Sequence, residues 1–180
     1  MAIRTLLVAT AGVAILACEP SDRAPTREKT PAPAAAVAPT LPASGRTISA
    51  PARAAMKDLL AGAGAGHKAW ILAQPGDAEV ASLAESLSGL FKEAGWEVSA
   101  STASGITLKP GVMTLAADEE FPPYVDAVVR ALDGSGLDAK SASGYRGYYE
   151  AKKQENPAWP GIALRADQEF VIVIGPKPAA

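Results

Sequence analysis

The segment from residue 145 to residue 159 has the residue types of a binding surface. Three of the four tyrosines fall within five residues, beside Arg and Lys, and a tryptophan follows between two prolines. Flat rings with a polar edge, next to cations, suit the recognition of a glycan, a peptide or another protein. The same rings could instead fold over a sheet edge and complete a small core. The candidate binding residues are Tyr145, Arg146, Tyr148, Tyr149, Lys152 and Trp159.

A second candidate group consists of the acidic residues 118–120 together with Asp77 and the neutral amide Gln74. Each set follows an apolar run expected to be a strand, so the two sets would meet if those strands were parallel neighbours. Clustered carboxylates can hold a hard cation or act as acid and base, as in a small hydrolase. Their ordinary role is to place negative charge before a helix, where the helix dipole favours it. No metal site is therefore assigned.

Other catalytic arrangements lack the residues they need. His67 is the only histidine, and no serine stands in the context of a nucleophile elbow, so His67 is expected to lie at the surface or to cap a strand. The glycines at 62, 64 and 66 follow a helix and precede a strand, the reverse of a phosphate-binding loop. No thiol follows Cys18. We therefore predict no catalytic residue and no cofactor, and binding rather than catalysis.

The elements that must position these residues begin at Pro51, which suits the first turn of a helix. Asp77 is a suitable N-cap for a helix whose apolar residues recur every three or four positions up to Ala94. Short apolar runs bounded by Gly and Pro predict strands. Helices are expected at 51–62, 77–94 and 122–133, strands at 69–73, 96–101, 112–116, 137–142 and 170–174, and an irregular stretch at 143–161 with a helical turn near 148–153.

This order of elements predicts an α/β fold. Three of the expected strands are apolar on both faces and need cover on both, whereas the two that alternate, 96–101 and 137–142, belong at edges. The prediction is a single small domain with a mixed, largely parallel sheet of about five strands, flanked by helices. Because a βαββαβ order is embedded in the chain, a ferredoxin-like arrangement with an extra strand is the alternative.

The N-terminus has the pattern of a targeting segment. Arg4 precedes an uncharged apolar stretch that ends at Ala17 and is too short to span a bilayer. Ile15-Leu16-Ala17-Cys18 resembles the lipobox of bacterial lipoproteins, in which a type II signal peptide is removed before a Cys that carries diacylglycerol. The resemblance implies a signal peptide at 1–17 and acylation, including palmitate, at Cys18. Glu19 favours, by analogy, the periplasmic face of the outer membrane or the cell surface.

The rest of the chain divides into a tether and a domain. Residues 18–50 comprise the lipidated Cys and a Pro/Ala-rich segment with too few large apolar residues to form a core, so a disordered linker is expected there. Residues 51–180 form the expected α/β domain. Its segments Glu93–Val98 and Ile174–Pro178 resemble small α/β domains of uncharacterised role in membrane-attached bacterial proteins. That resemblance implies a domain and carries no activity.

Charge restricts the class of partner. The chain has a net charge of -2, and residues 51–180 contain sixteen Asp and Glu against twelve Lys and Arg. Nucleic-acid binders need a basic surface to neutralise phosphates, so this class is excluded. The sequence favours a membrane-anchored envelope lipoprotein whose domain binds a cell-wall component such as peptidoglycan, or an envelope protein. The alternative is a small carboxylate-dependent envelope hydrolase.

Overall fold

The computed structural model describes residues 45–179. The predicted signal peptide, Cys18 and most of the predicted tether lie outside the described residues. Four helices and five strands follow one another in the order α1 (Ala50–Gly62), β1 (Lys68–Ala73), α2 (Ala78–Glu93), β2 (Glu97–Thr102), β3 (Val112–Ala116), α3 (Pro123–Asp133), β4 (Lys140–Ala142), α4 (Tyr145–Glu155) and β5 (Phe170–Ile174).

The five strands form one mixed sheet in the order β2-β1-β5-β3-β4. All neighbouring pairs are parallel except β3 and β5, which are antiparallel. The prediction of an α/β domain with a largely parallel sheet is therefore confirmed. The two alternating segments do form the edge strands β2 and β4, because only a strand with a wet side tolerates an edge.

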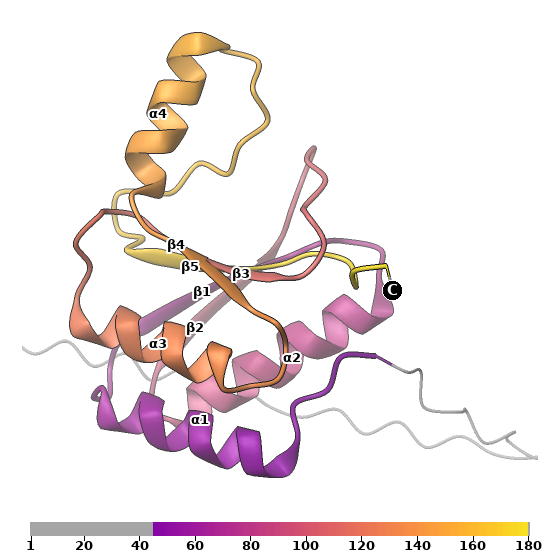
Figure 1. The fold of residues 1–180 in the computed structure, drawn as a ribbon, viewed down its shortest axis with the longest axis vertical. Coiled ribbons are helices and arrows are strands. Elements are labelled where there is room, and N and C mark those ends of the chain that lie inside the picture. The colour runs from indigo at the N-terminus through magenta and orange to yellow at the C-terminus, as the bar shows by residue number, and fades with distance from the viewer. Residues whose placement is uncertain (1–44, 180) are drawn as a thin grey trace, which may run out of the picture. The chain divides into compact units, whose positions relative to one another are not determined.

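Helices α1, α2 and α3 cover one face of the sheet (Figure 1). The predicted cap at Asp77 forms, with Asp77 Oδ1 accepting from Glu79 N at 2.9 Å, and Ser49 Oγ caps α1 by accepting from Ala52 N at 3.3 Å. Burial on this side of the sheet is close to complete: Leu60 of α1 and Leu87 and Phe91 of α2 are fully buried. This face supplies most of the hydrophobic driving force for folding.

The opposite face of the sheet carries α4 and two loops instead of a layer of helices (Figure 1). The expected irregular stretch at 143–161 is wrong in its first part, because Tyr145–Glu155 is a regular helix of 11 residues that buries none of them. Gly144, with φ +66°, turns the chain into this helix. Lys152 and Lys153 lie in the last turn, where the helix dipole favours cations. Its only sign of a helical period is the spacing of Tyr145, Tyr148 and Tyr149, in an otherwise polar segment.

The described chain is already packed before α1 begins. Arg46 pairs with Glu79 on α2, with Nη2 to Oε2 at 2.8 Å, and also donates to the Gly175 carbonyl at 2.8 Å. Both partners are largely buried. Among residues 45–179, no helix is long and apolar enough to cross a membrane.

Candidate functional site

A pocket of about 860 Å³ lies on the face of the sheet that α1, α2 and α3 leave open. Strand register explains its floor. Met113 on β3 pairs with Val173 on β5, and Leu115, two residues further along β3, projects from the same face. These three apolar side chains line the pocket, and Ala142 on the edge strand β4, opposite Leu115, continues the row. The floor is thus built by the alternation of β3 and β5.

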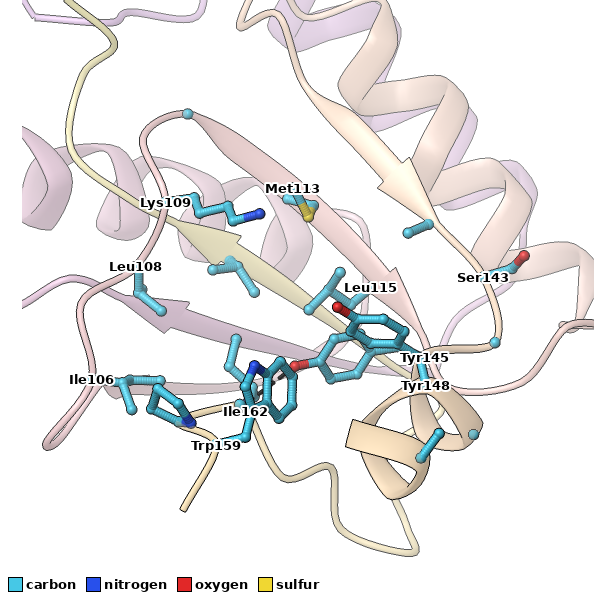
Figure 2. Close-up of a pocket in the computed structure, with 18 of the residues that line it drawn as sticks. Ile106, Leu108, Lys109, Met113, Leu115, Ser143, Tyr145, Tyr148, Trp159 and Ile162 are labelled. Atoms are coloured by element: carbon cyan, nitrogen blue, oxygen red, sulfur yellow. Dashed lines mark hydrogen bonds between the residues drawn. The ribbon is translucent and has the colours of Figure 1, made fainter. Parts of the chain in front are cut away.

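Two loops contribute to the walls of this pocket (Figure 2). Ile106 and Leu108 come from the loop between β2 and β3, and Ile162 comes from the loop between α4 and β5. The first loop is fixed from below: Gln74 Oε1 accepts from Leu108 N at 2.7 Å, and Gly175 N donates to Gly111 O at 2.9 Å. A Cβ at Gly175 would overlap the Lys109 carbonyl, so the close approach of loop and strand requires glycine there.

The third wall is aromatic and comes from α4 and the segment after it. Tyr145, Tyr148 and Trp159 all line the pocket. The Tyr148 ring lies edge-on to Trp159 at 5.7 Å between centroids, and 6.1 Å from the ring of Tyr145. Trp159 lies over Gly161, where a Cβ would overlap its ring. Tyr148 is 52% exposed, the most exposed large hydrophobic side chain of the described residues.

Polar contacts at its base hold α4 in place. Arg146 donates to the carbonyls of Arg165 and Gln168, at 3.4 and 3.2 Å, and its Nε lies 3.6 Å from Asp118 Oδ1. Ile162 N donates to the Tyr145 hydroxyl at 3.0 Å. Partial burial raises the pKa of Tyr145, with the Ile162 bond opposing, so this phenol is neutral at physiological pH. Tyr145 therefore serves both the pocket wall and the packing beneath α4.

The remaining candidate residues lie outside the pocket lining. The ring of Tyr149 packs against the ring of Trp159 at 5.8 Å between centroids. Lys153 Nζ lies 5.8 Å from the centroid of the Tyr149 ring. Lys152 Nζ lies 6.0 Å from the Tyr148 centroid and 2.6 Å from Glu155 Oε2, and the bond to Glu155 raises the pKa of Lys152. Tyr149 and Lys152 thus contact the rings of the aromatic wall without lining the pocket, and Arg146 holds the first turn of α4.

Four polar side chains outside the predicted aromatic binding set also line the pocket: Thr107, Lys109, Ser143 and Glu119, of which Glu119 belongs to the acidic group 118–120. Figure 2 shows Lys109 extending over the sheet toward Met113, with Ser143 on the far side of the pocket. Ser143 Oγ donates to Glu119 Oε2 at 3.1 Å. Alternation along β3 and β5 could have identified the floor residues. Nothing in the sequence indicates that loops rather than helices cover this face.

The condition under which the acidic residues 118–120 would meet Asp77 is not fulfilled. Strand β5 lies between β1 and β3 and is parallel to the first and antiparallel to the second. Strands β1 and β3 therefore run in opposite directions, and their C-terminal ends lie at opposite ends of the sheet. Gln74 and Asp77, which follow β1, are thus separated from residues 118–120, which follow β3. Asp77 caps α2. No group of three or more metal-ligating side chains occurs among residues 45–179.

His67 has a packing role in this structure. Its ring stacks on Tyr124 at 4.0 Å between centroids, with an interplanar angle of 14°, and lies 5.1 Å from the ring of Trp96. Its Nε2 is 3.1 Å from the Ala63 carbonyl at the end of α1. The glycine-rich stretch beside it connects α1 to β1, with positive φ at Gly64 and Gly66.

Comparison with known proteins gives no relative from which a function can be transferred. No protein-family model matches the chain. Neither the curated proteins nor the solved structures contain a match. The function has to be argued from the pocket and from the N-terminal sequence.

Proposed function

We propose that this protein is an envelope lipoprotein, anchored through acylated Cys18, whose α/β domain binds an envelope component in the sheet-face pocket and does not catalyse a reaction. The anchor rests on the lipobox-like Ile15–Cys18 and places the domain on the periplasmic face of the outer membrane or at the cell surface. Two or more acyl chains on one Cys give stable attachment, which a single chain does not.

The pocket is the observation that carries the binding role. Its volume of about 860 Å³ is within the range of small-ligand sites, and apolar and aromatic side chains form most of its lining. Tyr148 is exposed in the pocket, and Met113 and Ile106 are half-buried, so a ligand can reach apolar side chains from both the floor and the walls. Apolar and aromatic side chains that converge in one concave site are typical of ligand pockets.

The pocket chemistry favours binding over hydrolysis. Glu119 is its one carboxylate among the lining residues, and Asp77 lies at the other end of the sheet. The hydrolase alternative relied on a meeting of these groups and loses its geometric basis. The apolar floor also favours a protein or peptide over the glycan strands of the wall, because sugars need many hydrogen-bonding partners.

The anchor is tested by the variant Cys18→Ala. We expect the native chain to fractionate with membranes and to incorporate labelled fatty acid, and the variant to do neither. Uptake of label by the variant, or its unchanged membrane fractionation, would remove the lipid anchor from the proposal.

The binding role is tested by photo-crosslinking in intact cells, with matched positions on α4. Ala151 lines the pocket and is exposed, whereas Gln154 is exposed on the same helix but does not line it. We expect a photo-reactive residue at 151 to give a discrete adduct that is lost with Tyr148→Ala and kept with Glu150→Ala, a change at an exposed position of α4 that does not line the pocket. Equal adducts from positions 151 and 154, or an adduct insensitive to Tyr148→Ala, would contradict binding in this pocket.

A further inference from the structure

The pocket has opposite charges on opposite sides. Lys109 comes from the loop between β2 and β3 and reaches over the floor, whereas Glu119 lies on the far side, next to Ser143 (Figure 2). Apolar and aromatic side chains fill the space between them. A ligand that spans this pocket therefore meets a cation at one end and a carboxylate at the other.

Glu119 is held in position without a counter-ion. Its one hydrogen bond is with the Ser143 hydroxyl, and its carboxyl group occupies the space that a Cβ at Gly144 would need. The neighbouring Asp118 is paired with Arg146 at the base of α4. Within residues 45–179, Glu119 has no Lys or Arg partner. A carboxylate beside aromatic rings is suited to bind an ammonium group, which rings attract through cation–π contact.

Lys109 is the positively charged counterpart of Glu119 in the pocket lining. It is exposed at the rim and, among the described residues, forms no ion pair with any carboxylate. Its carbonyl is fixed by the close approach of Gly175, so the backbone that carries this ammonium group is well positioned. A carboxylate of the ligand is the natural partner for it.

We propose that the occupant of the pocket is a short apolar peptide with free termini, its amino terminus at Glu119 and its carboxyl terminus at Lys109. This proposal rests on the proposed function and names the ligand class. A fatty acid or other single-headed amphiphile would satisfy one of the two charges and leave the other without a partner. A zwitterion with apolar side chains matches both ends and the floor between them.

The probes are synthetic peptides of alternating Leu and Ala, two to six residues long. Each is prepared with free termini, N-acetylated, C-amidated or blocked at both ends. Binding to the full-length protein in detergent-free nanodiscs is followed by calorimetry and by the change in total tryptophan emission, to which the half-buried Trp159 of the pocket contributes beside the buried Trp70 and Trp96. An extended peptide grows by about 3.3 Å per residue, so one length should fit the span between the two charges best.

We expect the peptide with free termini to bind most tightly and each block to weaken binding by about 1.5-fold to fivefold, as for exposed ion pairs. Glu119→Gln should abolish the effect of acetylation and leave that of amidation. Lys109→Met should do the reverse. The exposed residues Glu120 and Lys92 do not line the pocket, so Glu120→Gln and Lys92→Met are the matched controls and should change neither.

The outcomes separate this proposal from the proposed function. If peptides blocked at both ends bind as tightly as free ones and Tyr148→Ala still weakens them, the pocket binds apolar groups and the charge matching is wrong. If no peptide binds while the position-151 adduct still forms in cells, the peptide class is wrong and the binding role stands. Loss of both would overturn both proposals.

Discussion

The best-defined charged contact of the described chain is the pair between Arg46 and Glu79. Their side chains are 9% and 16% exposed, and Arg46 donates to both carboxylate oxygens at 2.8 Å and to Glu79 Oε1 from its backbone N at 2.9 Å. Bidentate geometry of this kind is stronger than an ordinary surface ion pair. The bonds from Arg46 lower the pKa of Glu79 below its usual 4.5. The pair thus ties the start of the described chain to α2.

This lowered pKa predicts a pH dependence of stability. Because the folded state binds the proton less well than the unfolded state, the contribution of Glu79 is complete above pH 4.5 and is lost as the pH falls through the depressed folded pKa. Glu79→Gln should lower the free energy of unfolding at pH 7 by about 1.5–3 kcal/mol and flatten its decline on acidification below that value. Denaturant titrations from neutral to acid pH measure both.

The pair between Arg53 and Glu93 is the matched control for this prediction. Its side chains are 33% and 48% exposed, and its N to O distance is 2.6 Å. Solvent screens such a pair, so Glu93→Gln should change stability by at most about 1 kcal/mol. Equal effects of the two substitutions would show that burial does not strengthen the Arg46 pair.

At the scale of elements, α4 is the least supported part of the domain. It buries no residue, lacks a side-chain N-cap, and is held mainly through Arg146 and Tyr145 at its first turn. An isolated helix of 11 residues is marginal in water, so α4 depends on these contacts and on the rings against Trp159. Its local stability should therefore be lower than that of α2.

Two glycines in and beside α4 give opposite predictions. Gly144 has φ +66° and faces the Glu119 carboxyl group, so Gly144→Ala should strain the backbone and displace Glu119, at a cost of about 1–2 kcal/mol. Gly147 lies inside the helix with open space around it, so Gly147→Ala should stabilise α4 by about 0.5–1 kcal/mol. Hydrogen exchange of the α4 amides measures both, and two shifts of the same sign would contradict this assignment.

Helix α4 also shows why part of the site could not be predicted from the sequence. Strands and helices that build the core repeat their apolar residues at the period of the element, and β2 and β4 were recognisable as edges by alternation. The tyrosines of α4 do stand at i, i+3 and i+4, but glycine and charged residues fill the other positions, so this short helical repeat is easily missed. The rings were recognisable as a candidate site, but Glu119 and Lys109 join them only through the fold.

At the scale of the whole molecule, the order of the strands in the sheet differs from their order in the sequence. Strand β5 is last in sequence and occupies the centre of the sheet between β1 and β3. Its five residues are all buried, as the continuous apolar run predicts. A run of this kind specifies a central strand without specifying its neighbours, so the sequence left open whether β1 and β3 are adjacent. The same insertion reverses β3 and sends residues 118–120 to the pocket side of α4.

The two faces of the sheet should respond differently to loss of apolar volume. Leu87 on α2 is fully buried in the core on the helix-covered face of the sheet, and Leu87→Ala should cost about 2–5 kcal/mol because it leaves a cavity. Met113 is half-buried on the pocket floor, where removal of its side chain only enlarges an existing opening. Met113→Ala should cost about 1 kcal/mol, as expected for partial burial.

Ligand binding should be affected in the opposite order, by Met113→Ala more than by Leu87→Ala. This order distinguishes a ligand site from a part of the core that is merely incompletely covered. Met113→Ala should weaken the crosslinked adduct from position 151, whereas Leu87→Ala should leave it intact at temperatures where the variant stays folded. Urea titration of both variants, beside the crosslinking assay, checks the two orders in one experiment. A large stability loss with Met113→Ala and no change in the adduct would mean that the open face serves packing alone, because a floor residue of a working pocket must contact its ligand.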